Sequence, residues 1–194
     1  MFRLKMPTDP RWANVAESNI KEILIDHAFC EQKAASSAIS IITQFPEYTD
    51  IVEAMSELAI EEMQHFRLVL KKIKDRGWKL GRERKDNYVN DLIKFFSGGG
   101  SREQMLINKL LLGAMIEARS CERFKVFSDN VNDEDLAKFY RDLMISEANH
   151  YTLFLKFARK YGEGVCDVDK LWEEFLAYEA DVIQSYGKSE TIHG

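Results

Sequence analysis

The segment ELAIEEMQHF, residues 57–66, contains a Glu-x-x-His pair formed by Glu62 and His65. Residues three positions apart on an α-helix share a face, so both side chains can bind the same metal ion. A further acidic residue, Glu31, precedes Glu62 by 31 positions (62 − 31). This spacing fits two antiparallel helices joined by a turn near Pro46, because each leg from the turn measures about 20 to 25 Å at 1.5 Å per residue.

A second copy of the same triplet follows in the other half of the chain. Glu117 precedes Glu147 by 30 positions (147 − 117), and Glu147 forms a Glu-x-x-His pair with His150 in the segment LMISEANHY, residues 143–151. One Glu from each of two helices plus a Glu-x-x-His pair from each of two others is how a four-helix bundle holds two iron or manganese ions. The sequence therefore predicts an all-α bundle with a two-metal centre, whose ligands are Glu31, Glu62, His65, Glu117, Glu147 and His150.

The apolar periodicity of each predicted helix places the ligand carboxylates on the side that faces the core. Around Glu62 the stripe consists of Met55, Leu58, Glu62, His65, Val69 and Ile73. Four buried carboxylates without partners would be destabilising, because an isolated ion loses its hydration, whereas two divalent cations balance four negative charges. Oxygen-rich ligation with one His per ion suits iron or manganese better than structural zinc. Iron is favoured, and manganese stays open.

A third Glu-x-x-His pair, Glu190 and His193, is not expected to bind metal. It lies in the polar tail SYGKSETIHG, where apolar periodicity is absent, and Lys160 stands thirty residues before it in place of a Glu. A single Glu-x-x-His pair is more often a solvated helical pair than a metal site. The prediction therefore depends on the duplicated pairs that face the core.

Composition indicates one domain spanning residues 1–194, since a chain of this length can bury one substantial core. The N-terminal MFRLKMPTDPRW has no apolar region typical of a signal peptide, and no stretch approaches the length of a membrane helix. We expect a cytoplasmic protein that does not bind membranes. Three cysteines without a pairing motif agree with a reducing compartment, and the absence of Cys-x-x-Cys argues against a rubredoxin-type iron centre.

Helix-capping residues agree with a bundle over about residues 12–161. Pro46 is expected to start the second long helix, Ser101 with Gln104 is expected to form a capping box before the third, and Asn132 and Asp133 offer caps for the fourth. Between the second and third helices we expect a long crossover, residues 71–100, with a short helix around 87–96. An additional helix is expected over about 167–186, capped by Asp167.

The expected crossover begins with a basic run, KKIKDRGWKLGRERK, residues 71–85. The run carries eight Lys or Arg against two acidic residues, so its formal charge is +6, whereas the whole chain is −5 and the other 179 residues sum to −11. A charge run is usually a solvated helix end, and a phosphate-binding role is the equally weighted alternative. The candidate contacts are Trp78, Lys79, Arg82, Arg84 and Lys85.

The ligand-bearing segments resemble the ferritin-like non-haem di-iron superfamily: HAFCEQKAAS (27–36), ELAIEEMQHF, GAMIEARSCERF (113–124) and LMISEANHY. Within it, RWANVAE (11–17), KDRGWKLGRERKDNY (74–88) and IEARSCERF (116–124) resemble the bacterial family that hydroxylates the prenyl group of 2-methylthio-isopentenyl-adenosine in tRNA, next to the anticodon. The resemblance extends from about Pro7 to Tyr186.

This resemblance implies an O2-dependent monooxygenase with two ferrous ions, an external electron donor and an unidentified redox partner. It assigns the six motif residues as ligands and implies that Glu62 and Glu147 bridge both ions. Beyond the ligands it implies no further catalytic residue. The metal carries the chemistry, and the protein holds it in an apolar site that excludes water.

Residues one turn from the ligands are candidates for the substrate pocket and for contacts to the ligands. Small and apolar side chains that could leave room for a prenyl group are Ala35, Val69, Ala114 and Phe154. Cys121 is interpreted as a small core residue lining this space rather than a catalytic thiol. His27, one turn before Glu31, is expected to hydrogen-bond a ligand carboxylate rather than to act as a seventh ligand.

Other functions share this ligand set. A ferritin-like ferroxidase or iron-binding protein and a di-manganese catalase-like protein remain alternatives. The small subunit of ribonucleotide reductase is disfavoured, because the position of its radical tyrosine is Val69 here. The non-enzyme alternative is a metal-stabilised helical binding module whose interface is the basic run.

Overall fold

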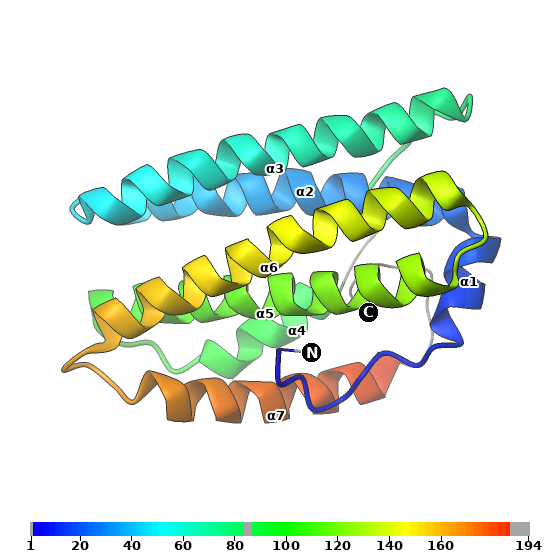
Figure 1. Ribbon diagram of the computed structural model, residues 1–194. Helices are drawn as coiled ribbons and strands as arrows, with labels where there is room; N and C mark the ends of the chain where they lie inside the picture. The colour runs from blue at the N-terminus through cyan, green and yellow to red at the C-terminus, as the bar shows by residue number, and fades with distance from the viewer. Residues whose placement is uncertain (1, 84–86, 187–194) are drawn as a thin grey trace. The chain divides into compact units, whose positions relative to one another are not determined.

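The computed structural model describes residues 2–83 and 87–186, and all regular structure within them is helical (Figure 1). The described chain divides into two compact units. Residues 18–83 form one unit, and residues 2–17 with 87–186 form the other. In the part of the chain that the structure describes, no helix is both long and apolar enough to cross a membrane.

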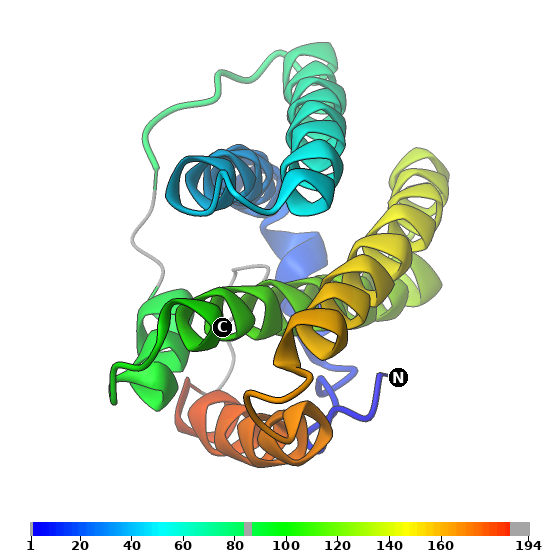
Figure 2. The same ribbon diagram turned by 90° about the vertical axis from the view of Figure 1, so that its left-hand side faces the viewer.

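The first unit is an antiparallel pair of long helices, α2 (Ile20–Gln44) and α3 (Thr49–Asp75), and is called the α2/α3 unit. Both views show the two helices side by side (Figures 1 and 2). On α3 the whole predicted stripe is buried, from Met55 to Ile73, with Glu62 and His65 at its centre. On α2 the corresponding face is buried over Leu24, His27, Glu31, Ala35 and Ala38, whereas Ile20 and Ile42 near the helix ends are half-buried.

The second unit is built around another antiparallel pair, α5 (Arg102–Asn130) and α6 (Glu134–Gly162), and is called the α5/α6 unit. The Ser101 hydroxyl accepts a hydrogen bond from the Gln104 N–H at the start of α5, and the Asp133 carboxylate accepts one from the Leu136 N–H at the start of α6. Both bonds satisfy amide groups that a helix N-terminus otherwise leaves without partners, so they fix where the two helices begin.

Shorter elements complete the α5/α6 unit: α1 (Trp12–Ser18, of which residues 12–17 belong here), α4 (Tyr88–Ile93), the 3₁₀ helix η1 (Lys94–Phe96) and α7 (Val168–Tyr186). Asp167 caps α7 as predicted, since its carboxylate accepts from the Lys170 N–H at 3.0 Å. Aromatic rings join η1 to α7, with ring centroids 4.9 Å apart for Phe95 and Phe175. The predicted short helix and additional helix are therefore both present.

Two predicted boundaries are wrong. Pro46 does not start a helix, because α3 begins at Thr49. The Tyr48 N–H bonds to the Phe45 carbonyl at 3.2 Å, so Pro46 occupies the second position of a β-turn, where its fixed φ is favoured. The crossover is also shorter than predicted, since α3 continues through residues 71–75. Cationic side chains near a helix C-terminus favour its dipole, so the first basic residues of the run extend the helix.

Two predicted caps also differ. The Gln104 side chain does not return to Ser101 as a capping box requires; its amide donates to Asn108 Oδ1 at 2.8 Å instead. Asn132 is not the cap of α6, because its backbone and side-chain N–H groups both donate to Glu17 Oε1, at 2.8 and 2.7 Å. Asp133 alone caps this helix.

Candidate metal centre

In the α2/α3 unit, the predicted triplet converges on one point between two helices. Glu31 comes from α2, whereas Glu62 and His65 come from consecutive turns of α3, and all three are buried. Each residue offers a donor atom within 4.8 Å of the others. His65 Nδ1 lies 3.4 Å from Glu62 Oε2 and 3.8 Å from Glu31 Oε2. The structure thus brings together three residues that the sequence separates by up to 34 positions (65 − 31).

The α5/α6 unit holds the second triplet in the same way. Glu117 comes from α5, Glu147 and His150 come from α6, and all three are buried. Their donor atoms also lie within 4.8 Å of one another, and His150 Nδ1 is 3.6 Å from Glu147 Oε2. Each unit therefore contains two carboxylates and one imidazole close together, as the repeat predicts.

This donor set fits a divalent cation in each triplet. Two ligands bonded to one ion at about 2.0 to 2.2 Å lie roughly 3 to 4 Å apart, and the imidazole-to-carboxylate distances in both triplets fall in this range. Buried carboxylates close to one another repel, and a cation removes that cost. Carboxylate oxygen with a single imidazole is the ligation that iron and manganese accept.

His27 contacts the first triplet from one turn earlier on α2. Its Nε2 lies 2.5 Å from Glu31 Oε1, and both side chains are almost fully buried. The hydrogen bond expected between His27 and Glu31 is present, and that Glu31 binds a metal stays a prediction.

The residues proposed to line a pocket are all buried: Ala35, Val69, Ala114, Cys121 and Phe154. The Cys121 thiol donates to the Met144 carbonyl at 3.2 Å. Burial, with a smaller contribution from the charge of Glu147, raises the pKa of Cys121 to about 12. The thiol is therefore neutral near pH 7, as expected for a core residue rather than a nucleophile. That these side chains line a substrate pocket stays a prediction.

The basic run continues beyond α3 as an irregular segment of the α2/α3 unit. Trp78 is half-buried, whereas Lys79 and Arg82 are exposed. Near the end of the segment, Glu83 forms an ion pair with Lys33 of α2 at 2.6 Å. The segment thus returns along α2 with two of the candidate cations facing solvent. Arg84 and Lys85 lie outside the described residues, as do Glu190 and His193 of the tail.

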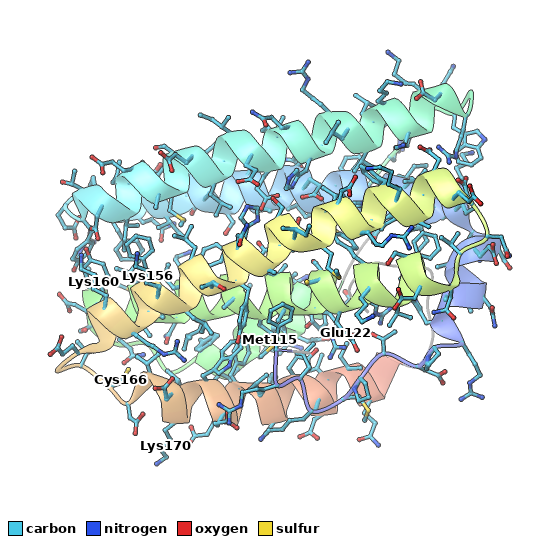
Figure 3. All side chains as sticks on the ribbon, viewed as in Figure 1. Met115, Glu122, Lys156, Lys160, Cys166 and Lys170 are labelled. Carbon is cyan, nitrogen blue, oxygen red and sulfur yellow. The ribbon has the colours of Figure 1, made fainter. Side chains whose placement is uncertain are left out.

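A buried polar network behind α5 was not predicted. Arg119 is fully buried, and its guanidinium donates to Glu179 of α7 at 2.6 and 2.9 Å and to Glu122 at 2.8 Å. Glu122, labelled in Figure 3, accepts from the Thr8 N–H at 2.7 Å, and Tyr88 donates to Glu179 at 2.9 Å. These bonds tie the N-terminal segment, α4 and α7 to the helix that carries Glu117.

The network also brings together two segments that supported the narrower resemblance. Arg123 of IEARSCERF lies over the ring of Trp12 of RWANVAE, with 4.4 Å from its guanidinium carbon to the ring centroid. Burial, together with the nearby charge of Arg119, lowers the pKa of Arg123 to about 10. Every residue from 117 to 124 is buried, although this segment contains two Glu and two Arg. Such a concentration of charged residues within a core helix was the sequence feature that could have indicated the network. Periodicity alone does not identify the partners of such charges.

Comparison with known proteins identifies the family of the chain. The family model described as tRNA-(MS2IO6A)-hydroxylase (MiaE) matches residues 2–194. The chain belongs to this hydroxylase family. A curated relative from Pseudomonas putida, tRNA 2-(methylsulfanyl)-N(6)-isopentenyladenosine(37) hydroxylase, is 37% identical, and the match covers 98% of this chain and 91% of the relative. A relative of the same name from Salmonella typhimurium is 27% identical, with 98% of this chain and 87% of the relative covered.

A solved structure supports the fold. The chain resembles a protein with aldehyde deformylating oxygenase activity from Synechococcus, with a TM-score of 0.86 and 30% identity, covering 98% of this chain and 95% of the other. The predicted fold class, an all-α ferritin-like bundle, is confirmed. Membership of the hydroxylase family also confirms the predicted enzyme class.

Proposed function

We propose that this protein is a di-metal, O2-dependent monooxygenase that hydroxylates the isopentenyl group of 2-methylthio-isopentenyl-adenosine in tRNA. The proposed substrate and reaction are inferred from membership of the hydroxylase family, whose model matches residues 2–194. The two buried carboxylate and imidazole triplets supply the ligands that such a reaction needs. The ferroxidase, catalase-like and non-enzymatic alternatives lack a comparable observation.

The proposal assigns all six triplet residues to one two-metal centre within a single ferritin-like domain. The α2/α3 unit would supply Glu31, Glu62 and His65, and the α5/α6 unit would supply Glu117, Glu147 and His150. Two divalent cations would balance the four carboxylates, and iron is the preferred metal with manganese as the alternative. Glu62 and Glu147 are the proposed bridging ligands, by the superfamily resemblance.

When bound, the metal pair would react with O2 and so supply the oxidising power to attack a C–H bond. The balance requires one O2, two electrons and two protons per turnover, which give one hydroxyl group on the substrate and one water. The electrons must come from an external donor. The chain's own part is to hold the ligands and to surround the reacting carbon with apolar side chains, for which Val69, Ala114 and Phe154 are the candidates.

The proposed tRNA contact is the basic segment that follows α3. Lys79 and Arg82 are exposed, and phosphate groups pair with such cations at an energy that falls with added salt. Trp78 offers a ring for stacking, and Arg84 and Lys85 extend the same run. Because tRNA is the proposed substrate, we also propose a cytoplasmic location.

The activity is tested with iron-reconstituted protein, a chemical reductant, ¹⁸O2 and tRNA that bears the prenylated nucleoside. We expect a hydroxylated nucleoside containing one ¹⁸O atom by mass spectrometry of the digested tRNA. Absence of this product, with metal bound and reductant consumed, would contradict the assigned reaction.

The tRNA contact is tested by reversing two charges, Lys79→Glu with Arg82→Glu. We expect a larger loss of turnover on tRNA than on the free nucleoside, because only the tRNA presents flanking phosphates to the segment. The matched control reverses two exposed lysines of the α5/α6 unit, Lys156→Glu with Lys170→Glu, both labelled in Figure 3. Equal losses on both substrates would show that the segment is not a phosphate site.

A further inference from the structure

The two triplets differ in the residues one helical turn away from their ligands. At one such position the first triplet has the larger side chain, and at the other position the second triplet has it. Four residues before the α2 ligand Glu31 stands His27, whereas four residues before the α5 ligand Glu117 stands Gly113. Four residues after His65 stands the small Val69, whereas four residues after His150 stands the large Phe154. These positions lie next to the ligands on the same helix faces.

His27 holds one oxygen of Glu31. Because a carboxylate oxygen only accepts hydrogen bonds, the 2.5 Å contact to Oε1 requires a proton on His27 Nε2. The other oxygen, Oε2, lies 3.8 Å from His65 Nδ1, on the side of the remaining donors. The two oxygens of Glu31 therefore make different contacts: Oε1 contacts His27, and Oε2 is directed toward the other donors of the triplet.

The same arrangement cannot form from Gly113 in the α5/α6 unit. A glycine has no side chain to donate, and the space beside it is filled by an aromatic ring. A Cβ atom at Gly113 would lie 2.9 Å from the ring of Phe154, which is itself buried. The position one turn before Glu117 therefore has apolar surroundings, whereas the corresponding position before Glu31 is occupied by a polar side chain.

We propose that His27 is a positioning residue that holds Glu31 as a one-oxygen ligand and so makes the two metal positions inequivalent. The inference rests on the proposed two-metal function. Residues that orient a ligand by hydrogen bonding commonly change metal affinity 10- to 100-fold when they are removed. Loss of His27 should therefore lower the binding affinity for only one of the two ions. The affected ion is the one bound by Glu31.

The test is a titration of metal-free protein with Mn²⁺, in which the electron paramagnetic resonance signal of free Mn²⁺ reports the bound fraction. The wild-type protein should bind two ions per chain. His27→Leu should bind one ion with unchanged affinity and the other about 10- to 100-fold more weakly. His27→Gln keeps an amide donor of similar reach and should recover part of that loss, which a general loss of packing would not allow.

Ile41→Ala is the matched control, because Ile41 is buried on the same helix about 15 Å along the axis from Glu31, at 1.5 Å per residue. It should lower thermal stability without changing either affinity. Unchanged affinity for both ions in His27→Leu would overturn the positioning role. Failure of the wild-type protein to bind two ions would instead overturn the proposed function, so the two failures are distinguishable.

Discussion

The α2/α3 and α5/α6 units carry the same triplet on helices with very different surroundings. On α3 the side away from the ligands faces solvent, where Ile60 and Met63 are 63% and 40% exposed. On α5 every residue from 117 to 124 is buried, and the side away from Glu117 holds the network of Arg119, Glu122 and Glu179. The three ligand-type residues repeat, and the supporting faces do not.

The comparison of the two helices distinguishes residues needed for the proposed chemistry, which occur in both units, from residues that stabilise only one unit. The proposed metal chemistry requires two carboxylates and an imidazole on one face, and both units have these side chains. The α5/α6 unit must also hold α7, α4 and the N-terminal segment, and its charged network does so. Substitutions that act on one face only can test this division.

The largest effect is expected from the ligands themselves. Glu62→Gln and Glu147→Gln each remove one negative charge from the proposed centre while keeping the side-chain shape. Hydroxylation should fall at least about 100-fold in both variants, beyond the range typical for an outer hydrogen-bond partner, with reduced metal content. The control is Glu57→Gln on the exposed face of α3. A wild-type rate in either ligand variant would show that the triplet it belongs to is not needed for the reaction.

The network behind α5 should dominate stability. Glu179→Ala leaves the buried guanidinium of Arg119 without its main partner, and the free energy of unfolding should fall by about 3 to 5 kcal/mol. Urea unfolding of the metal-free protein measures this. The control is Asp142→Ala, which breaks an exposed pair with Lys138 on α6 and should leave the midpoint almost unchanged. Similar losses for both variants would remove the distinction between the supporting faces.

A smaller loss is expected where Phe154 packs on α5. Gly113→Ala places a Cβ atom 2.9 Å from the Phe154 ring and should cost about 1 to 3 kcal/mol, because the ring must shift within a packed core. Gly98→Ala is the control, since nothing lies within 4 Å of a Cβ atom there. If Gly113→Ala were as well tolerated as Gly98→Ala, the apolar contact would not distinguish the second triplet.

The smallest effect concerns thiol reactivity. Burial raises the pKa of Cys121 to about 12, so at pH 8 it holds less thiolate than an ordinary cysteine, and the fraction stays low until the pH approaches that value. Iodoacetamide at pH 8 should therefore leave Cys121 unmodified in the folded protein and modify it in urea, as peptide mass mapping would show. Rapid modification in the folded protein would contradict its place in the core.

Periodicity and spacing predicted the fold and both triplets because a metal ligand must break an apolar stripe at a fixed interval. Glu62 and Glu147 stand where Leu would be expected, and that local signal is readable without a structure. The partners of Arg119 were not predictable in this way. Glu179 and Thr8 lie 60 and 111 residues from it, and nothing in their local sequence indicates the pairing. Pro46 was misplaced because a proline suits the second position of a turn as well as the first turn of a helix.

We propose that the two triplets together bind a pair of metal ions. The most direct measurement is a crystal structure of the iron-loaded protein with anomalous diffraction at the iron edge. We expect two peaks about 3.5 to 4 Å apart, with all six proposed ligands within bonding distance: Glu31, Glu62, His65, Glu117, Glu147 and His150. A single peak, or two peaks with any of these six side chains directed away from them, would contradict it.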